Sequence, residues 1–261
     1  MKKTKIIAFA NHKGGVGKTT TTASVGSILA HEGYNVLVID MDAQANLTAS
    51  LLKTNPEEEE SDQTIYHALT CRTPLPHVPV SDHLDICPAS LQLAMADSEL
   101  ASTIARERIL SKLLDDAICN KYDFILIDCP PSLGVITLNA ITACTDIVIP
   151  IVAEVLPFKG LKMINSFISQ IHSLLNPAAH VTGILITRWE STKLSRSVEE
   201  LLRGQLGELV FGTKIRKNVS VAEAPLENQN IVEYAPKSNG AADYMSFTKE
   251  LLHRLSVERK E

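Results

Sequence analysis

The sequence predicts an α/β fold in which a doubly wound, mostly parallel β-sheet carries helices on both faces. Short apolar runs alternate with helical stretches, as strands do when crossover helices join them. These runs lie at residues 6–10, 36–40, 84–87, 124–128, 147–152 and 183–186. With 261 residues and 45% apolar content the chain can bury a substantial core, and we expect one domain over residues 1–261.

The first apolar run leads into a glycine-rich loop. Residues 13–20 read K-G-G-V-G-K-T-T, and a helical stretch follows. Gly14, Gly15 and Gly17 can adopt backbone angles closed to residues with a Cβ, so the loop can wrap its N–H groups around an anion. The N-terminus of the helix aims its free donors and positive dipole end at the same anion. The segment therefore predicts a P-loop that binds ATP.

The side chains of this loop have separate predicted roles. Lys18 would place its ammonium on the β- and γ-phosphate oxygens, Thr19 would ligate Mg²⁺ and Thr20 would bind an α-phosphate oxygen. The predicted nucleotide-binding loop comprises Lys13, Gly14, Gly15, Val16, Gly17, Lys18, Thr19 and Thr20. A glycine turn before an ordinary surface helix is the alternative, and the order of strand, loop and helix disfavours it.

Lys13 is unusual because a common P-loop needs no lysine at its first position. The pattern K-G-G-V-G-K-T-[ST] resembles the deviant Walker A loop of the ParA/MinD family, in which this lysine reaches across a dimer to the partner's nucleotide. The resemblance implies a homodimer that encloses ATP, and Lys13 as a catalytic residue beside Lys18. A second cation would offset the charge that builds up on the transferring phosphoryl group. A solvated lysine at the loop mouth is the alternative.

The apolar run at residues 36–40 ends in aspartate and continues as D-x-D-x-Q-x-N. Ligands of doubly wound sheets bind at the carboxyl ends of strands, where these carboxylates lie. The pattern resembles the first switch segment of the ParA/MinD family, which implies that Asp42 orients the attacking water beside the magnesium ion. Asp40 could be an outer magnesium group or a cap at the strand end.

The apolar run at residues 124–128 also ends in aspartate, and C-P-P-S-L-G follows it. This segment resembles the Walker B strand and second switch of the family, with prolines that stiffen the turn. The resemblance implies that Asp128 holds Mg²⁺ through water. The predicted metal site therefore comprises Thr19, Asp42 and Asp128.

The resemblance covers roughly residues 4–255, with residues 51–104 poorly matched. Other matches lie at residues 146–150, 154, 160–161, 237–241 and 244. The segment I-R-K-N-V-S-V-A-E-A-P at residues 215–225 is similar to one that lies near the adenine, which implies nucleotide contacts by Arg216, Asn218 and Pro225. Arg216 stands where the family has proline, and Ser220 stands where some members have an arginine that contacts DNA.

The net charge of −5 means that a contact with nucleic acid must come from a local patch. Residues 188–217 contain seven basic and four acidic side chains. The candidates for phosphate contacts are Lys193, Arg196, Arg216 and Lys217. They carry no base-reading pattern, so we expect sequence-independent binding to double-stranded DNA. A solvated helix face is the alternative.

Two other functions compete with DNA binding. Phe247, Leu251, Leu252 and Leu255 form an amphipathic stripe that would suit a membrane-surface switch of MinD type, but such a stripe also packs a terminal helix onto its own sheet. Glu250 beside the stripe would be repelled by anionic lipid. A small-molecule ligase that uses ATP is the third possibility, although nothing in the chain resembles a dedicated substrate pocket.

The apolar run at residues 6–10 is too short for a secretory signal, and no stretch approaches the roughly 20 apolar residues that span a membrane, so we expect a cytoplasmic protein. The resemblance implies that it is nucleoid-associated. Five cysteines without a C-x-x-C pair predict reduced, mostly buried thiols and no zinc site. Residues 56–90 are expected to be largely irregular, with a solvated acidic loop at residues 57–60. The resemblance implies a ParA-type partition ATPase whose hydrolysis a ParB-like protein stimulates.

Overall fold

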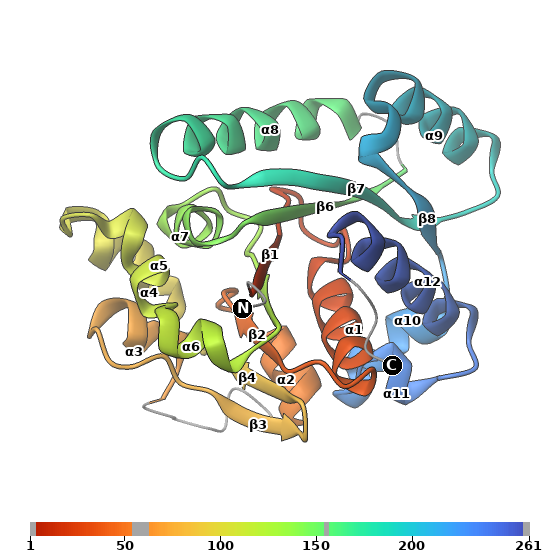
Figure 1. Ribbon diagram of the computed structural model, residues 1–261. Coiled ribbons are helices and arrows are strands. Elements are labelled where there is room, and N and C mark those ends of the chain that lie inside the picture. The colour runs from red at the N-terminus through yellow and green to blue at the C-terminus, as the bar shows by residue number, and fades with distance from the viewer. Residues whose placement is uncertain (1–3, 54–62, 154–156, 258–261) are drawn as a thin grey trace.

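The computed structural model describes residues 4–53, 63–153 and 157–257, without the side chains of residues 157–159. The acidic run at residues 57–60, Glu154 and residues 258–261 lie outside the described residues. Eight strands form one sheet in the order β3-β4-β2-β5-β1-β6-β7-β8 (Figure 1). Each pair of neighbours is parallel except β3 and β4. The predicted doubly wound α/β fold is confirmed.

Six of the eight strands match the predicted apolar runs. The strands are β1 (Lys5–Phe9), β2 (Val36–Asp40), β3 (Val78–Ser81), β4 (Leu84–Cys87), β5 (Phe124–Asp128), β6 (Asp146–Val152), β7 (His180–Trp189) and β8 (Val210–Arg216). The two that were not predicted, β3 and β8, are the edges of the sheet. Pro79 interrupts one and Gly212 the other, and each edge strand has a partly exposed pattern in place of a continuous apolar run.

Helices cover both faces of the sheet (Figure 1). They are α1 (Lys18–His31), α2 (Asn46–Leu52), α3 (Ile65–Thr70), α4 (Leu93–Glu99), α5 (Ile109–Leu113), α6 (Asp116–Lys121), α7 (Val135–Ala143), α8 (Pro157–Leu174), α9 (Lys193–Leu206), α10 (Val219–Glu223), α11 (Ile231–Tyr234) and α12 (Asn239–Arg254). One apolar core joins the sheet to α1, α2, α11 and α12, and a second joins it to α3, α4, α5, α7, α8 and α9. Residues 56–90, expected to be irregular, contain α3 and β3 as well as the predicted β4.

Helix α1 contains four consecutive threonines, although β-branched residues are weak helix formers. Thr21 and Thr22 are fully buried, and their hydroxyls donate to the carbonyls of Gly17 and Lys18 at 2.6 and 3.0 Å. This bonding to the preceding turn satisfies the buried hydroxyls within α1 and its N-cap residue, and Thr21 also lies 3.4 Å from the Tyr244 hydroxyl of α12. The helix that starts at the P-loop can therefore lie inside the molecule.

The apolar stripe near the C-terminus is buried in α12 and the turn after it. Phe247, Leu251, Leu252 and Leu255 are at most 4% exposed and pack in the core that α1 shares with the sheet. The stripe thus has the packing role that was the alternative to a membrane contact. Among the described residues, no helix combines the length and the apolar character that crossing a membrane requires.

The cysteines follow the predicted pattern of mostly buried, free thiols. Cys87, Cys129 and Cys144 are buried, Cys119 is half-buried and Cys71 is exposed. Burial raises the pKa of the Cys87, Cys129 and Cys144 thiols, so they stay protonated near neutral pH.

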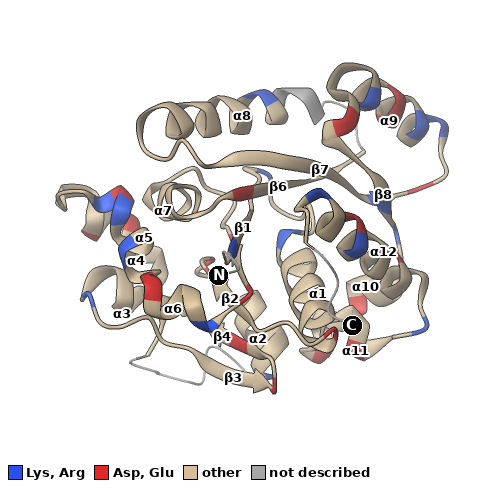
Figure 2. Ribbon diagram, in the orientation of Figure 1, with Lys and Arg blue, Asp and Glu red and all other residues tan. Residues whose placement is uncertain are grey.

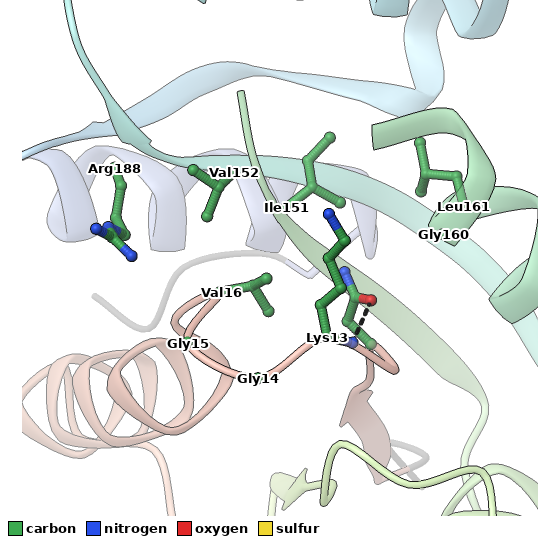
Figure 3. Close-up of a pocket in the computed structure, with 10 residues that line it drawn as sticks. Lys13, Gly14, Gly15, Val16, Ile151, Val152, Gly160, Leu161 and Arg188 are labelled. Atoms are coloured by element: carbon green, nitrogen blue, oxygen red, sulfur yellow. Dashed lines mark hydrogen bonds between the residues drawn. The ribbon is translucent and has the colours of Figure 1, made fainter. Parts of the chain in front are cut away.

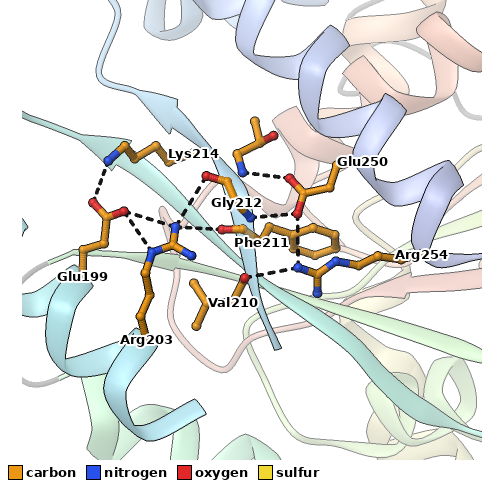
Figure 4. Close-up of polar contacts among 9 residues, drawn as sticks. Glu199, Arg203, Val210, Phe211, Gly212, Lys214, Glu250 and Arg254 are labelled. Atoms are coloured by element: carbon orange, nitrogen blue, oxygen red, sulfur yellow. Dashed lines mark hydrogen bonds and ion pairs between the residues drawn. The ribbon is translucent and has the colours of Figure 1, made fainter. Parts of the chain in front are cut away.

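Side chains from two helices cap the free edge of β8 (Figure 4). The pairing with β7 shifts register between Val210 and Lys214, which frees backbone groups of the intervening residues. The Glu250 carboxylate of α12 accepts the N–H groups of Gly212 and Thr213 at 2.7 and 2.8 Å. Arg203 of α9 donates to the Phe211 carbonyl at 2.9 Å, and Arg254 of α12 donates to the Val210 carbonyl at 3.1 Å.

We expect Glu250→Ala to lower the free energy of unfolding by about 2 kcal/mol, because two strand N–H groups lose a charged acceptor. Burial raises the pKa of Glu250, but the bonds from Thr213 and Gly212 and the Arg254 charge outweigh it, so the net pKa is lowered. Because the pKa of Glu250 is lower in the folded chain than in the unfolded chain, its ionised carboxylate stabilises the folded state at pH values above the unfolded-state pKa. This stabilisation is lost as the pH falls through the folded-state pKa. Urea denaturation should therefore show a smaller difference between wild type and variant at low pH than at pH 7.

Glu208→Ala, which removes an exposed carboxylate nearby, is the control. Equal stability of both variants at pH 7 would contradict the capping role.

Candidate nucleotide-binding site

The glycine-rich loop has the backbone expected of an anion cradle. Gly15 and Gly17 have φ angles of 70° and 85°, in the left-handed region that favours glycine. Gly17 is the residue before α1, so its conformation sets the entry into the helix. A Cβ at Gly15 would meet no atom within 4 Å, so the requirement there is the backbone angle and not space.

The side chain of Lys18, the first residue of α1, folds back over the loop and is shielded from solvent. Its side chain is buried with the residue 6% exposed, and Nζ donates to the Lys13 carbonyl at 3.2 Å. This hydrogen bond holds the Lys18 ammonium over the loop that runs from Lys13 to Lys18. A desolvated cation in this place interacts strongly with a phosphate oxygen.

Two buried polar side chains, which were not predicted, fix the loop to the sheet. Asn11 donates through Nδ2 to the Pro150 carbonyl at 2.7 Å and accepts the Lys13 N–H at 3.1 Å. The Thr187 hydroxyl lies 2.8 Å from the Val16 carbonyl and 3.0 Å from the Ile151 carbonyl. In the sequence, Asn11 and Thr187 each stand out only as one polar residue next to an apolar run. Many residues without a functional role show the same pattern, so it does not predict these contacts.

A cavity of about 150 Å³ opens in front of the loop. It is lined by Asn11, residues 13–16, the end of β6 at residues 151–152, residues 160–161 of α8, and Arg188. Figure 3 shows the Lys13 side chain extending across this cavity toward Ile151. No described residue forms an ion pair or a hydrogen bond with the Lys13 ammonium, and Lys13 is exposed.

Strand register brings the two strand-end aspartates next to the loop. Asp128 of β5 lies opposite Phe9 of β1 on one side and Asp40 of β2 on the other. The Thr19 hydroxyl donates to Asp128 Oδ2 at 2.6 Å, while Oδ1 is buried without a partner among the described residues. Burial first, and the Asp40 carboxylate second, raise the pKa of Asp128, against the opposing effects of Thr19 and Lys18.

The unpartnered Asp128 oxygen and the Thr19 hydroxyl fit a magnesium ion, because both are hard oxygen donors. Within the described part of the chain, no three His, Cys, Asp or Glu side chains gather to hold a metal by themselves. A site with few protein ligands is typical of Mg²⁺ bound with phosphate, since this ion keeps several of its waters.

Asp40 anchors the segment that carries Asp42. Its Oδ2 accepts the Thr48 N–H and hydroxyl at 2.9 and 2.8 Å, and its Oδ1 accepts the Asp42 N–H at 3.1 Å. Asp40 is therefore a capping residue, which was one of its two predicted roles, and burial raises its pKa. The Asp42 carboxylate accepts the Gln44 N–H at 3.1 Å through Oδ1 only. The second oxygen of Asp42 remains available at this edge of the sheet.

The second switch segment is supported by another residue that was not predicted. Asp97 of α4 accepts the Ile136 N–H at 3.1 Å and so caps the N-terminus of α7. A Cβ at Gly134 would collide with the Asp97 carboxylate. The glycine in the P-P-S-L-G segment thus lets α4 hold the turn that follows Asp128.

The proposed adenine segment, residues 215–225, begins with the last two residues of β8. Arg216 forms a bidentate pair with Asp243 of α12, with contacts of 2.6 to 3.2 Å between the guanidinium and the carboxylate. Asn218 caps α10 by accepting the Ser220 N–H at 2.9 Å, and Pro225 is exposed in a short 3-10 turn. The Arg216 guanidinium is therefore largely occupied within its own chain.

The four candidate phosphate-contact residues differ in whether their charges are already paired with side chains of this chain. Lys217 pairs with Glu190 at 3.0 Å, and Arg196 donates to the Ser191 hydroxyl at 2.6 Å. Lys193 begins α9 and has no polar side-chain contact with a described residue. Figure 2 shows basic and acidic segments interspersed around α9. Asp243 neutralises Arg216 from α12, so a count restricted to residues 188–217 overstates the free positive charge.

Comparisons with known proteins agree with this site. The family model for the AAA domain matches residues 4–181. The sporulation initiation inhibitor protein Soj of Bacillus subtilis is 38% identical over 251 residues, which are 95% of this chain and 98% of that protein. The chromosome-partitioning ATPase Soj of Thermus thermophilus is 36% identical, with 97% of each chain covered. A crystal structure of cobyrinic acid a,c-diamide synthase from Mycobacterium smegmatis, with an ATP analogue and magnesium, has a TM-score of 0.83 and 33% identity over 97% of this chain and 96% of that one.

The fold and the loop define a P-loop ATPase. The similarity to the two Soj proteins extends over nearly the whole length of each, so it includes the strands, the glycine loop and both aspartate segments. The chain belongs to the ParA/Soj family of ATPases.

Proposed function

We propose that this ATPase is a partition protein that forms a homodimer on binding ATP and Mg²⁺ and binds DNA non-specifically in that state. ATP and Mg²⁺ are its cofactors, as the family and the donor groups of Thr19 and Asp128 indicate. The observation that carries the proposal is Lys13, a lysine beside the phosphate loop whose ammonium pairs with none of the described residues. A ParB-like protein that stimulates hydrolysis would then release the dimer from the nucleoid.

Each site residue has a chemical task in this proposal. The loop N–H groups and Lys18 bind the phosphates, and the free oxygen of Asp42 accepts a hydrogen bond from the attacking water and so orients it. Lys13 of a second copy stabilises the charge that develops on the phosphates. Thr19 and Asp128 would hold Mg²⁺, which would neutralise charge on the β- and γ-phosphates. Hydrolysis should be slow until the dimer positions these groups together.

Lys13→Gln is expected to leave ADP affinity little changed while abolishing ATP-dependent dimerisation and stimulated hydrolysis. The side chain makes no polar contact with its own described chain, so its loss should leave the loop intact. Fluorescent ADP titration and size-exclusion chromatography with light scattering measure the two properties. Lys112→Gln removes an exposed lysine elsewhere and serves as the control. If Lys13→Gln dimerises as readily as wild type, Lys13 does not contact the partner's nucleotide and is a solvated lysine at the loop mouth.

The proposed function is tested by the binding of random-sequence duplex DNA and of anionic liposomes. Each is measured with a non-hydrolysable ATP analogue, with ADP and without nucleotide, across a salt series. DNA binding that requires the ATP analogue and weakens with salt is the expected result. Liposome binding alone would favour the membrane switch. Binding to neither would favour a protein cargo or a small-molecule client, and the synthase at 33% identity is a small-molecule enzyme by name.

The DNA contacts are expected to depend on Lys193 and Arg196 more than on Arg216 and Lys217, because carboxylates of this chain already hold the latter two. Lys193→Ala with Arg196→Ala should weaken binding to all sequences and reduce the slope of log affinity against log salt by about 2. The matched control is Arg72→Ala with Lys112→Ala, which removes the same charge from another surface. An equal loss of affinity in both double variants would mean that the net charge of the protein, and not direct contacts by Lys193 and Arg196, determines DNA binding.

A further inference from the structure

Arg188 has an unusual backbone at the edge of the nucleotide-binding cavity. It is the penultimate residue of β7, and its φ angle is 49°. Residues with a Cβ rarely adopt this left-handed conformation, and such outliers persist where the surrounding structure enforces them. An arginine here is therefore a reason to ask what its side chain does.

The residues on both sides of Arg188 hold the backbone in this conformation. The preceding Thr187 hydroxyl contacts the carbonyls of Val16 and Ile151, which joins β7 to the P-loop. The carbonyl of the following Trp189 accepts the Lys217 N–H at 2.9 Å. The turn at Arg188 directs its side chain to the cavity in front of the loop. Figure 3 shows the guanidinium on the side where Gly15 and Val16 turn.

The charge of Arg188 is not neutralised within the described chain. Arg203, Lys214, Arg216 and Lys217 in the same basic segment each have an ion-pair partner. No described residue forms a hydrogen bond or ion pair with the Arg188 guanidinium, and the residue is exposed. The cavity that it lines also receives Lys13, and none of the described residues that line it is acidic. Two unpaired cations beside exposed loop backbone make this cavity attractive to an anion.

We propose that Arg188 binds a phosphate group of a nucleoside di- or triphosphate, held either by its own P-loop or by that of a second copy. This inference rests on the proposed function and adds a residue to that site. A guanidinium presents several donors in one plane and matches phosphate oxygens better than an ammonium does. Thr187 ties the strand that carries Arg188 to the loop, so the backbone from which the guanidinium extends is fixed relative to the phosphate-binding loop.

The test compares Arg188→Ala and Arg188→Lys with wild type. Titration with fluorescent ADP reports the nucleotide of the same chain. Dimer formation with a non-hydrolysable ATP analogue, followed by light scattering, reports the nucleotide of the second copy. Arg72→Ala is a matched control, because Arg72 is also an exposed arginine with a left-handed backbone, at φ 57°, and it does not line the cavity.

We expect Arg188→Ala to weaken either ADP affinity or ATP-dependent dimerisation about tenfold. Weaker ADP binding identifies a phosphate of the same chain, and lost dimerisation with unchanged ADP binding identifies that of the second copy. Arg188→Lys should recover part of the loss, and Arg72→Ala should match wild type. Unchanged values for both properties in Arg188→Ala would overturn the inference while leaving the proposed function intact. A wild-type chain that binds no nucleotide would overturn both.

Discussion

Lys18→Ala is expected to abolish ATP binding, with an affinity at least about a hundredfold below that of wild type. Lys18 is buried, and its ammonium spans the loop to the Lys13 carbonyl, so the phosphates lose a desolvated and preoriented charge. ADP should be affected as well, because the loop holds the phosphates that both nucleotides share. Isothermal titration with each nucleotide in the presence of Mg²⁺ measures the loss.

Loss of binding must be separated from loss of fold in this variant. Circular dichroism and thermal unfolding without nucleotide should show that Lys18→Ala keeps its secondary structure and a cooperative transition. Lys112→Ala, on the exposed surface of α5, removes the same charge and should bind ATP as wild type does. ATP affinity retained in a folded Lys18→Ala protein would contradict the assignment of residues 13–20 as the nucleotide-binding loop.

Asp42→Ala is expected to lower ATP hydrolysis at least about a hundredfold and to accumulate an ATP-bound dimer. The carboxylate has one oxygen held by the Gln44 N–H and one available to orient water, and alanine supplies neither. Binding of ATP should persist, because the loop and Lys18 are untouched. Phosphate release and light scattering in ATP measure the two effects.

Two further variants define what Asp42 contributes. Asp42→Asn keeps an acceptor for the Gln44 N–H but lacks the negative charge, and we expect it to hydrolyse ATP as poorly as Asp42→Ala. Asp82→Ala removes an exposed carboxylate in the turn between β3 and β4 and should leave hydrolysis unchanged. A strictly monomeric Asp42→Ala protein in ATP would argue against the water-positioning role.

The central strands and the phosphate loop could be predicted because their physical requirements are local. Strands buried on both faces read as continuous apolar runs, and the loop needs glycine at positions such as Gly15 and Gly17, where φ is positive. The edge strands β3 and β8 are only partly buried, so their sequences lack this mark. The roles proposed for Lys13 and Asp42 came from the family pattern, and they remain predictions.

The remaining features of the site depend on contacts between distant parts of the chain. Thr187 meets Val16 across 171 positions, and Asn11 meets Pro150 across 139, so no local pattern identifies either residue. The pairing of Arg216 with Asp243 likewise joins β8 to α12, which a count of charges within one segment misses. Arg188 differs from its basic neighbours in its left-handed backbone and in the cavity that it lines, and neither can be read from its residue type.

The capped edge of β8 has a consequence for how this chain can associate. Open sheet edges invite strand addition from another molecule, and proteins protect them with charged side chains, prolines or short strands. At one edge the charged side chains of Glu250, Arg203 and Arg254 bind backbone groups of β8. At the other, β3 has four residues and contains Pro79, which lacks an N–H. A dimer of this protein would therefore have to assemble through loops and helices and not by extending one sheet into the next.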